Sequence, residues 1–348
     1  MNKYNNIIAK FRRKRLLVMG DLVLDQYIKG QVSRISPEAP VPIVLQQECF
    51  YTPGGAANVA NNLSSLGADV TLVGKIGDDI EGGILKRELA RRRIHTNGVF
   101  ADKSMETTFK TRIIAQHQQV VRVDRETSPA AGKDGIKDTK ILPFLRAQFS
   151  KYDVVIISDY GKGLIDLELL AQVHELALKH KTQVLIDPKM EDLRAYGQVT
   201  CITPNKKEAE TALKAIPEET RKAFGIVSAR LDNEKEIKAN GQGLLAYLGI
   251  DSLLVTLGEH GMYLFEHNKA PFPIPTRARE VFDVSGAGDT VISVFGLCLA
   301  VGAFKRDAAD IANYAAGVVV GKMGAVAVEL DELKQAVNTT RVPLRGTQ

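Results

Sequence analysis

The sequence lacks tryptophan and has only three cysteines, Cys49, Cys201 and Cys298, which lie far apart and form no CxxC or cysteine–histidine pair. This spacing argues against a disulfide framework and a structural metal site, and it favours a reducing, cytoplasmic compartment. The six histidines form no HExxH pair. The first apolar run is interrupted by Gly20 and Asp21, so it is too short for a signal sequence or a membrane span.

Dense charge clusters are also scarce. The 348 residues, 45% hydrophobic and 25% charged, are enough for one large α/β domain or two ordinary ones. The net charge is +5, and the only dense basic clusters, at 12–15 and 91–93, are not interleaved with aromatic residues. We therefore expect solvated helix faces there, no nucleic-acid partner and a small anionic substrate.

The stretch from residue 282 to 300 combines the turn Gly286-Ala287-Gly288-Asp289 with an apolar segment typical of a buried helix. Unpaired N–H groups and the positive end of the helix dipole make such a turn a site for an anion such as phosphate. Asp289 would repel that anion. Two alternatives remain open from these residues alone: Asp289 caps the helix, or it accepts a proton from the group that attacks the phosphate.

Short apolar runs that end in polar residues recur along the chain. The run at 16–19 ends in Gly20-Asp21 without a GxGxxG motif, which disfavours a nicotinamide cofactor. Runs at 153–158, 183–186 and 200–203 end in the polar segments 159–163, 187–189 and 204–208. This alternation predicts a doubly wound sheet with a ligand crevice at the carboxyl ends of its strands.

Two segments depart from this pattern. The Pro-rich segment 25–51 predicts extended strands and turns outside the main sheet. The segment 107–124 alternates and is rich in β-branched residues; even spacing places Lys110, Arg112 and Arg122 on one face, which suits either a sugar phosphate or solvent. Small residues from Gly54 to Ala60 open a helix, either for a ligand near Asn58 or for close packing.

Four motifs follow one another along nearly the whole chain: GGAANVA from 54, NxxE at 205–208, TLGxxG at 256–261 and DVSGAGDT at 283–290. In this order they resemble the ribokinase-type (pfkB) carbohydrate kinase family. More narrowly, RISPEAPVP, SDYGKG, DPK and TPNKKE resemble the heptose 7-phosphate kinases. Those enzymes phosphorylate the anomeric hydroxyl of D-glycero-β-D-manno-heptose 7-phosphate for the lipopolysaccharide core.

The resemblance implies an α/β, ribokinase-like fold with a mostly parallel sheet, a small β lid, and the use of ATP and Mg²⁺. It implies that Asp289 is the catalytic base and that the amides of Gly286, Ala287 and Gly288 form the anion hole. This agrees with the physics, because phosphoryl transfer requires mainly positioning and charge neutralisation.

The same resemblance assigns the remaining site residues. Sugar hydroxyls are expected at Asp21, Gly54, Gly55 and Asn58. The nucleotide is expected at Lys189, Asn205, Glu208, Thr256, Gly258, Gly261 and Asn313, with Glu208 acting on magnesium through water. A distal substrate phosphate needs cationic partners, for which our own candidates are Lys110, Arg112, Arg122 and Lys162.

One departure from the family concerns its cation. Many members have two hydroxyl residues before the glycine of DTTGAGD, whereas Val284 replaces one here. The family often binds a monovalent cation at the positions matching Asp283 and Ser285 and near Gly324, so a K⁺ site there is an open alternative.

We expect one kinase domain at 1–330, with lid segments near 25–51 and 105–125 and a tail at 331–348, and a homodimer. No HxGH-type nucleotidyltransferase segment occurs before Gln348, so we expect the single-function form of the enzyme. The alternatives are another sugar or phosphosugar kinase, and a non-catalytic nucleotide or sugar sensor.

Overall fold

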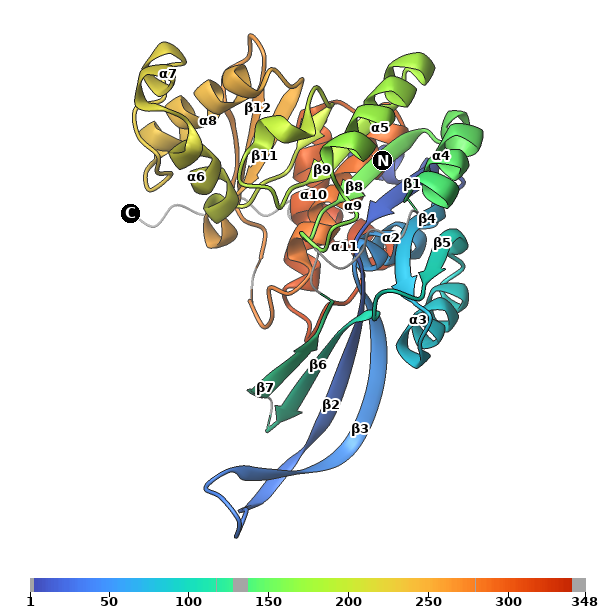
Figure 1. Cartoon of the computed structure of the whole chain (residues 1–348). Helices are drawn as coiled ribbons and strands as arrows, with labels where there is room; N and C mark the ends of the chain where they lie inside the picture. The colour runs from blue at the N-terminus through green and yellow to red at the C-terminus, as the bar shows by residue number, and fades with distance from the viewer. Residues whose placement is uncertain (1–2, 117, 128–136, 279, 340–348) are drawn as a thin grey trace, which may run out of the picture.

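The computed structural model describes residues 3–116, 118–127, 137–278 and 280–339, which form two sheets (Figure 1). The larger sheet has nine strands in the order β13-β12-β11-β10-β9-β8-β1-β4-β5. In chain order they are β1 (Arg15–Gly20), β4 (Asp69–Gly77), β5 (His95–Asp102), β8 (Val154–Ser158), β9 (Gln183–Asp187), β10 (Cys201–Ile202), β11 (Ser252–Thr256), β12 (Met262–Glu266) and β13 (Phe272–Ile274).

The strands from β5 to β11 pair in parallel, and only β12 and β13 are antiparallel. β1 lies between β4 and β8, so the chain builds the sheet outward in both directions from the β1/β8 boundary. Such a switch point leaves a crevice at the carboxyl ends of the strands, where α/β proteins bind ligands. The predicted doubly wound α/β fold is confirmed.

Helices cover both faces of this sheet, as a parallel sheet requires. They are α1 (Lys3–Ile8), α2 (Ala56–Ser65), α3 (Ile80–Arg91), α4 (Leu142–Gln148), α5 (Leu167–His180), α6 (Lys206–Ala215), α7 (Glu218–Ala223), α8 (Glu234–Leu248), α9 (Ala287–Ala300), α10 (Lys305–Val319) and α11 (Leu330–Thr339). Short helical turns lie at Lys137–Ile141, Phe149–Lys151, Leu193–Tyr196 and Gly258–His260.

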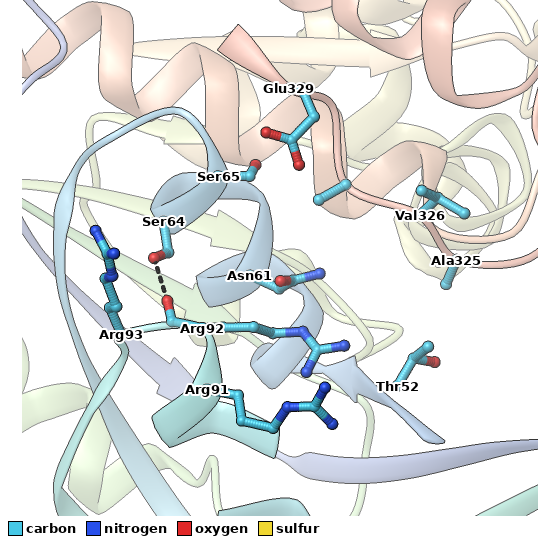
Figure 2. Close-up of a pocket in the computed structure, with 11 residues that line it drawn as sticks. Thr52, Asn61, Ser64, Ser65, Arg91, Arg92, Arg93, Ala325, Val326 and Glu329 are labelled. Atoms are coloured by element: carbon cyan, nitrogen blue, oxygen red, sulfur yellow. Dashed lines mark hydrogen bonds between the residues drawn. The ribbon is translucent and has the colours of Figure 1, made fainter. Parts of the chain in front are cut away.

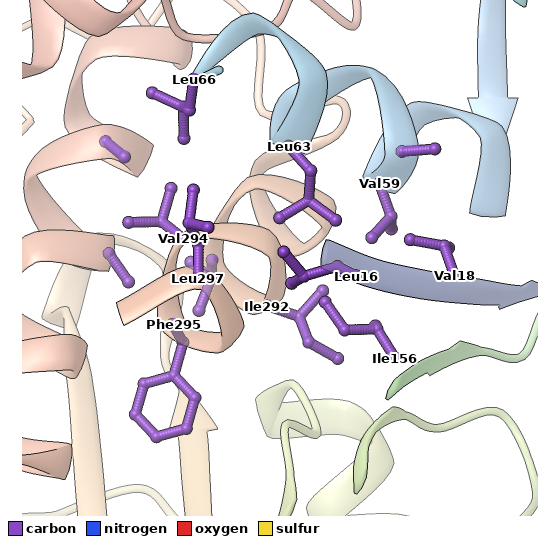
Figure 3. Close-up of a cluster of buried hydrophobic side chains, with 14 of the residues drawn as sticks. Leu16, Val18, Val59, Leu63, Leu66, Ile156, Ile292, Val294, Phe295 and Leu297 are labelled. Atoms are coloured by element: carbon purple, nitrogen blue, oxygen red, sulfur yellow. The ribbon is translucent and has the colours of Figure 1, made fainter. Parts of the chain in front are cut away.

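The core consists of two apolar layers, one on each face. Alternation along β1 sends Leu16 and Val18 to the layer that α2, α3, α9, α10 and α11 share, and Leu17 and Met19 to the layer of α4, α5, α6 and α8. Figure 3 shows α2 and α9 meeting over the sheet in the first layer. Because α9 is buried along nearly its whole length, its N-terminal turn is held firmly at the crevice.

The second sheet protrudes from the body as a long twisted ribbon (Figure 1). Its four strands have the order β3-β2-β6-β7 and comprise β2 (Leu22–Ile35), β3 (Pro42–Gly55), β6 (Thr108–Ala115) and β7 (Gln118–Arg125). These strands come from the two segments that we assigned to a lid, and β2 and β3 extend somewhat beyond them. We call this second sheet the lid.

Two expectations differ from the structure. The tail expected from residue 331 is largely the helix α11, which packs with Leu333 and Val337 buried; residues 340–348 lie outside the described residues. The basic cluster at 12–15 lies in a turn and the start of β1, not on a helix face, because β1 begins at Arg15. None of the described helices combines the length and apolar character needed to cross a membrane.

Candidate active site

The predicted catalytic aspartate lies at the switch point of the sheet. Asp289 is the third residue of α9 and is only 4% exposed. The helix begins after Gly286, and no side chain caps it, so Asp289 is not the helix cap. The amide of Asn58 in α2 donates to its Oδ2 at 2.7 Å, and the phenol of Tyr160 donates to its Oδ1 at 2.9 Å.

Burial raises the pKa of Asp289 to about 6, against the lowering effect of the hydrogen bonds from Asn58 and Tyr160. The nearby Asp25 carboxylate adds to the increase. A carboxylate with this pKa is mostly ionised at pH 7 and is a stronger base than an exposed aspartate, so it suits proton abstraction.

The turn before α9 can present amides to an anion. Gly286 has φ 77°, and a Cβ at this position would lie 2.8 Å from the Asn58 amide nitrogen, so glycine is required. The N–H of Ala287 donates to the Val284 carbonyl at 3.2 Å. The N–H groups of Gly286 and Gly288 have no backbone acceptor among the described residues, which leaves these two, rather than all three predicted amides, directly available.

Asp21 follows β1 and is held by the loop after β8. Its Oδ2 accepts hydrogen bonds from the backbone N–H of Tyr160 at 2.9 Å and of Lys162 at 3.0 Å. Burial nevertheless raises the pKa of Asp21 above the ordinary aspartate value. The two loops meet because Gly20 pairs with Ser158 at the boundary of β1 and β8.

Gly54 and Gly55 end β3 against the start of β2. A Cβ on Gly54 would lie 2.5 Å from the Asp25 carboxylate, and one on Gly55 would lie 2.5 Å from the Asp21 carbonyl. These glycines therefore permit β3 to approach the two aspartates closely just before α2 begins, the helix that carries Asn58. Both alternatives for the small residues from Gly54 to Ala60, a nearby ligand and close helix packing, require such a close approach of the backbone.

Asp25 and Arg112 form an ion pair at the base of the lid, with 2.5 Å between Oδ1 and Nη1. Both side chains are largely buried, at 7% and 14% exposure. Burial raises the pKa of Asp25, and the guanidinium opposes this increase. Arg112 also lies over the ring of Tyr27, 5.4 Å from its centroid.

The three basic residues of 107–124 do share one face of the lid. Arg112 is paired across the sheet with Arg122, and Lys110 with Asp124. Lys110 and Arg122 both contact Asp124, at 3.2 and 2.9 Å. Lys162 lies apart from them, in an ion pair with Glu126 just beyond the lid.

A cavity of about 320 Å³ brings together the residues expected to line the nucleotide. Its walls are mostly apolar, which suits the flat face of a base. The predicted residues among its lining are Thr256, Gly258, Gly261, Asn313, Ala287 and Gly288. It therefore connects the turn after β11 with the N-terminal turn of α9.

A second cavity, of about 400 Å³, lies elsewhere, between α2, the end of α3 and the 325–329 segment (Figure 2). Figure 2 shows Arg91 and Arg92 beneath Asn61, with Glu329 across from them. Both arginines contact Glu88, and none of the predicted site residues lines this cavity. The cavity is therefore separate from the site around Asp289.

The sequence pattern described as pfkB family carbohydrate kinase matches residues 13–332. The chain belongs to this family. It is therefore a carbohydrate kinase, as the motifs predicted. Similar relatives include the bifunctional protein HldE of Desulfatibacillum aliphaticivorans, 41% identical over 327 residues, and that of Geobacter metallireducens, 42% identical over 328 residues.

These relatives are longer than the chain. The matches cover 94% of this chain and 64% of each relative, so the chain spans about two thirds of their length. Among solved structures, an Arabidopsis thaliana ribokinase complexed with ribose and ATP has a TM-score of 0.67 and 17% identity, over 94% of this chain and 99% of that one. This likeness supports the ribokinase-like fold.

In this family member, the NxxE residues begin α6. Asn205 and Glu208 form a capping box, in which each side chain accepts a hydrogen bond from the other's backbone N–H at 3.0 Å. The Glu208 Oε1 lies 3.9 Å from the ammonium of Lys189, and Asn205 is bridged to Thr256. The predicted phosphate and magnesium residues thus lie beside the cavity-lining Thr256.

The described residues contain no group of three or more histidine, cysteine, aspartate or glutamate side chains suited to a metal ion. Mg²⁺ does not require such a group, because it keeps several waters and is held by one or two carboxylates together with substrate phosphates. The Oε1 of Glu208 takes no part in the capping box and lies 3.9 Å from the Lys189 ammonium, so it is able to accept a hydrogen bond from a magnesium-bound water.

The loop of Asp283 is tied to the 320–325 segment. Its Oδ1 accepts from the N–H of Ser285 at 2.9 Å and its Oδ2 from the N–H of Gly324 at 3.0 Å. The hydroxyl of Tyr27, in the lid, accepts from the neighbouring Ala325 N–H at 3.1 Å. The residues expected around a monovalent cation therefore do lie together, although both carboxylate oxygens already accept a hydrogen bond.

Sequence reasoning missed four groups of the site: Tyr160, Asp25, Tyr27 and Asp187. Removal from water raises the pKa of Asp187 well above the ordinary value, and the Asp289 and Glu208 carboxylates add to the increase. Tyr160 follows β8 and Asp187 ends β9, so their position at the carboxyl ends of strands could have marked them as site residues. Asp25 and Tyr27 lie within a strand, where no local signal marks them.

Proposed function

We propose that the protein transfers the γ-phosphoryl group of ATP to the anomeric hydroxyl of D-glycero-β-D-manno-heptose 7-phosphate, which gives the 1,7-bisphosphate for ADP-heptose and lipopolysaccharide core synthesis. The observation that carries the chemistry is the buried Asp289 carboxylate, oriented by Asn58 and Tyr160 at the end of the nucleotide cavity.

In the proposed reaction, Asp289 accepts the proton of the sugar hydroxyl as the hydroxyl oxygen forms a bond to the γ-phosphorus. The bond from that phosphorus to the bridging oxygen breaks, and ADP leaves. The free N–H groups of Gly286 and Gly288 would stabilise the charge on the transferred group. Bound Mg²⁺ would neutralise phosphate charge, with Glu208 and Asn205 on its water shell and Lys189 on a phosphate.

The sugar is proposed to lie between Asp21, Asn58 and the glycines of β3. A 7-phosphate at its far end would meet the basic face of the lid, where Lys110, Arg112 and Arg122 outnumber Asp25 and Asp124. Lys162 would reach the same end on release from Glu126. The motifs shared with heptose 7-phosphate kinases, together with relatives named bifunctional protein HldE, support this choice of sugar.

The substrate is tested by measuring ATP consumption over a panel of free sugars and sugar phosphates. We expect the highest kcat/KM for the heptose 7-phosphate, and the free heptose should be much poorer because it lacks the dianion. A preference for ribose, fructose or another unphosphorylated sugar would support the alternative, another kinase of the same family.

The base is tested with Asp289→Asn. Loss of a general base lowers kcat by about 10²- to 10⁴-fold, while binding of ATP, measured by calorimetry, should survive. Full turnover in this variant would contradict the assignment. If the wild-type protein bound ATP and sugar phosphate without consuming ATP, the remaining alternative, a non-catalytic sensor, would be favoured.

The ions are tested separately. Removal of Mg²⁺ with a chelator should abolish turnover, and readdition should restore it. Replacement of K⁺ by a bulky organic cation should lower kcat if Asp283, Ser285 and the Gly324 region bind a monovalent ion. Unchanged kinetics would remove K⁺ from the proposal without affecting the rest.

We also propose that the protein is a homodimer formed through the lid. The lid exposes large apolar side chains on its strands, among them Leu45, Val121 and Val123 at 65%, 45% and 56% exposure. Such a surface on a small sheet is normally covered, here by a second copy. Light scattering after size exclusion should give twice the chain mass, and Val123→Lys should give the single mass.

A further inference from the structure

We infer that Tyr160 is a positioning residue that acts through Asp289, by donating a hydrogen bond to the carboxylate oxygen that Asn58 does not contact. This inference rests on the proposed role of Asp289 as the base. Tyr160 lies in the SDYGKG segment and is not among the residues proposed to bind the nucleotide or the sugar.

The geometry favours a dedicated contact. Tyr160 Oη lies 2.9 Å from Oδ1 of Asp289, and Asn58 Nδ2 lies 2.7 Å from Oδ2. With one donor on each oxygen, rotation of the carboxylate about its own axis is prevented. Each oxygen still has a lone pair for the sugar hydroxyl. The base is thus oriented before substrate arrives, which lowers the entropy cost of reaching a reactive geometry.

The tyrosine is itself held independently of Asp289. Its backbone N–H donates to Asp21 at 2.9 Å, and the next residue, Gly161, adopts φ 68° and donates to Asp159 at 2.8 Å. Asp159 in turn accepts a hydrogen bond from the Tyr196 phenol at 2.6 Å. The Tyr160 ring therefore projects toward Asp289 from an anchored loop, which ties the sugar-side Asp21 to the base.

The charged surroundings of Asp289 make this donor important. Asp25 from β2 disfavours a negative charge on Asp289, and the charge on Asp289 in turn raises the pKa of Asp187 at the end of β9. Among the described residues, the neutral donors Asn58 and Tyr160 are the groups that lower its pKa. Burial and these carboxylates raise the pKa of Tyr160 well above 10, so its phenol remains a donor throughout the working pH range.

The test is the pH dependence of kcat/KM for Tyr160→Phe, which removes only the hydroxyl. Loss of a hydrogen bond to a charged group should move the acid limb upward by about one pH unit. Activity should fall about tenfold near pH 5.5 and much less above about pH 8.5, where the base is ionised in both proteins. KM for ATP should be unchanged.

The matched control is Tyr247→Phe in α8, whose ring packs on Phe224 and whose hydroxyl has no hydrogen-bond partner among the described residues. It should keep the wild-type pH profile. Thermal unfolding of both variants at each pH shows whether either loses stability. Where both remain fully folded, the position of the acid limb reports the pKa of the base and not the amount of folded protein.

An acid limb that does not move in Tyr160→Phe would overturn the inference, even if activity fell equally at every pH, because that pattern indicates substrate contact or packing. Failure of the proposed function gives a different result. If Asp289→Asn remained active, the base assignment itself would be wrong; if it were inactive while Tyr160→Phe kept the wild-type limb, only the positioning role would be wrong.

Discussion

The amide of Asn58 in α2 donates a 2.7 Å hydrogen bond to the buried carboxylate of Asp289 in α9, across 231 residues of sequence. Two of the family motifs, GGAANVA and DVSGAGDT, therefore meet in a single contact. Gly286 makes the contact possible, since any side chain there would displace the Asn58 amide.

Asn58→Asp should place a second carboxylate against Asp289. Two carboxylates at hydrogen-bond distance cannot both ionise readily, so one should keep a proton at pH 7. We expect kcat/KM to fall by about 100-fold or more, as for loss of a general base. Asn61→Asp, one turn of α2 farther on and lining the cavity of Figure 2, is the matched control and should stay near wild type. Equal losses in both variants would contradict the prediction.

Asp289→Asn should become more stable than the wild type as pH rises. The folded-state pKa of about 6 exceeds the ordinary value of 3.8, so the aspartate favours folding fully below about pH 4 and loses that contribution as pH rises through 6. Asparagine does not titrate. The difference in free energy of unfolding between variant and wild type should therefore change by about 2 kcal/mol from pH 4 to pH 7.

Urea unfolding at several pH values measures this difference, and the contributions of other buried carboxylates largely cancel in it. The absolute gain at pH 7 should be smaller, because asparagine cannot accept from both Asn58 and Tyr160. A difference that does not vary with pH would show that Asp289 is not destabilised in its charged form.

Arg112→Met should destabilise the protein strongly, since it leaves the Asp25 carboxylate buried without its cation. We expect a loss of about 3–5 kcal/mol in urea unfolding. Arg122→Met is the matched control on the facing strand; its side chain is 48% exposed in its pair with Asp124, so the loss should be under about 1 kcal/mol. Adding Asp25→Asn to Arg112→Met should recover much of the stability, and absence of recovery would contradict the ion-pair explanation.

Gly261→Ala should disturb the cavity that we propose for the nucleotide. Gly261 has φ 80°, and a Cβ there would lie 2.1 Å from the Ile274 carbonyl oxygen. Gly258, in the same turn, also has positive φ but has open space around its Cβ position. Gly258→Ala should lower the free energy of unfolding by about 1–2 kcal/mol, because alanine disfavours a positive φ. Gly261→Ala should lower the free energy of unfolding further and should also raise KM for ATP. If the two variants had the same free energy of unfolding and the same KM for ATP, the clash with the Ile274 carbonyl oxygen would have been relieved by a local shift of the backbone.

Several features of the site were predictable from local sequence. The apolar runs at 16–19, 153–158 and 183–186 become the buried strands β1, β8 and β9, because a strand buried on both faces needs continuous apolar sequence. Polar residues follow each of these strands at the crevice. The NxxE and TLGxxG motifs proved to be neighbours because Asn205 bridges Thr256. Their common location follows from strand order, which the motif order alone does not specify.

The role of each charged side chain was less predictable. Even spacing placed Lys110, Arg112 and Arg122 on one face, yet only the structure separates the buried Arg112–Asp25 pair from the more exposed contacts of Lys110 and Arg122 with Asp124. Asp25 comes from a different strand, and its distance from Arg112 depends on the register of β2 against β6.

The sequence by itself determined the family, the alternation of strands and helices, and the glycine-rich turn before α9, because these depend on local patterns of apolar residues and glycines. The residues of this turn alone left Asp289 suited to either capping or catalysis, and the family resemblance favoured catalysis. Only the tertiary structure excluded the capping role, because α9 begins after Gly286 without a side-chain cap, and only the tertiary structure brought Asn58 and Tyr160 to the two carboxylate oxygens. Contacts across more than 100 residues depend on sheet order and helix packing, which no local pattern encodes.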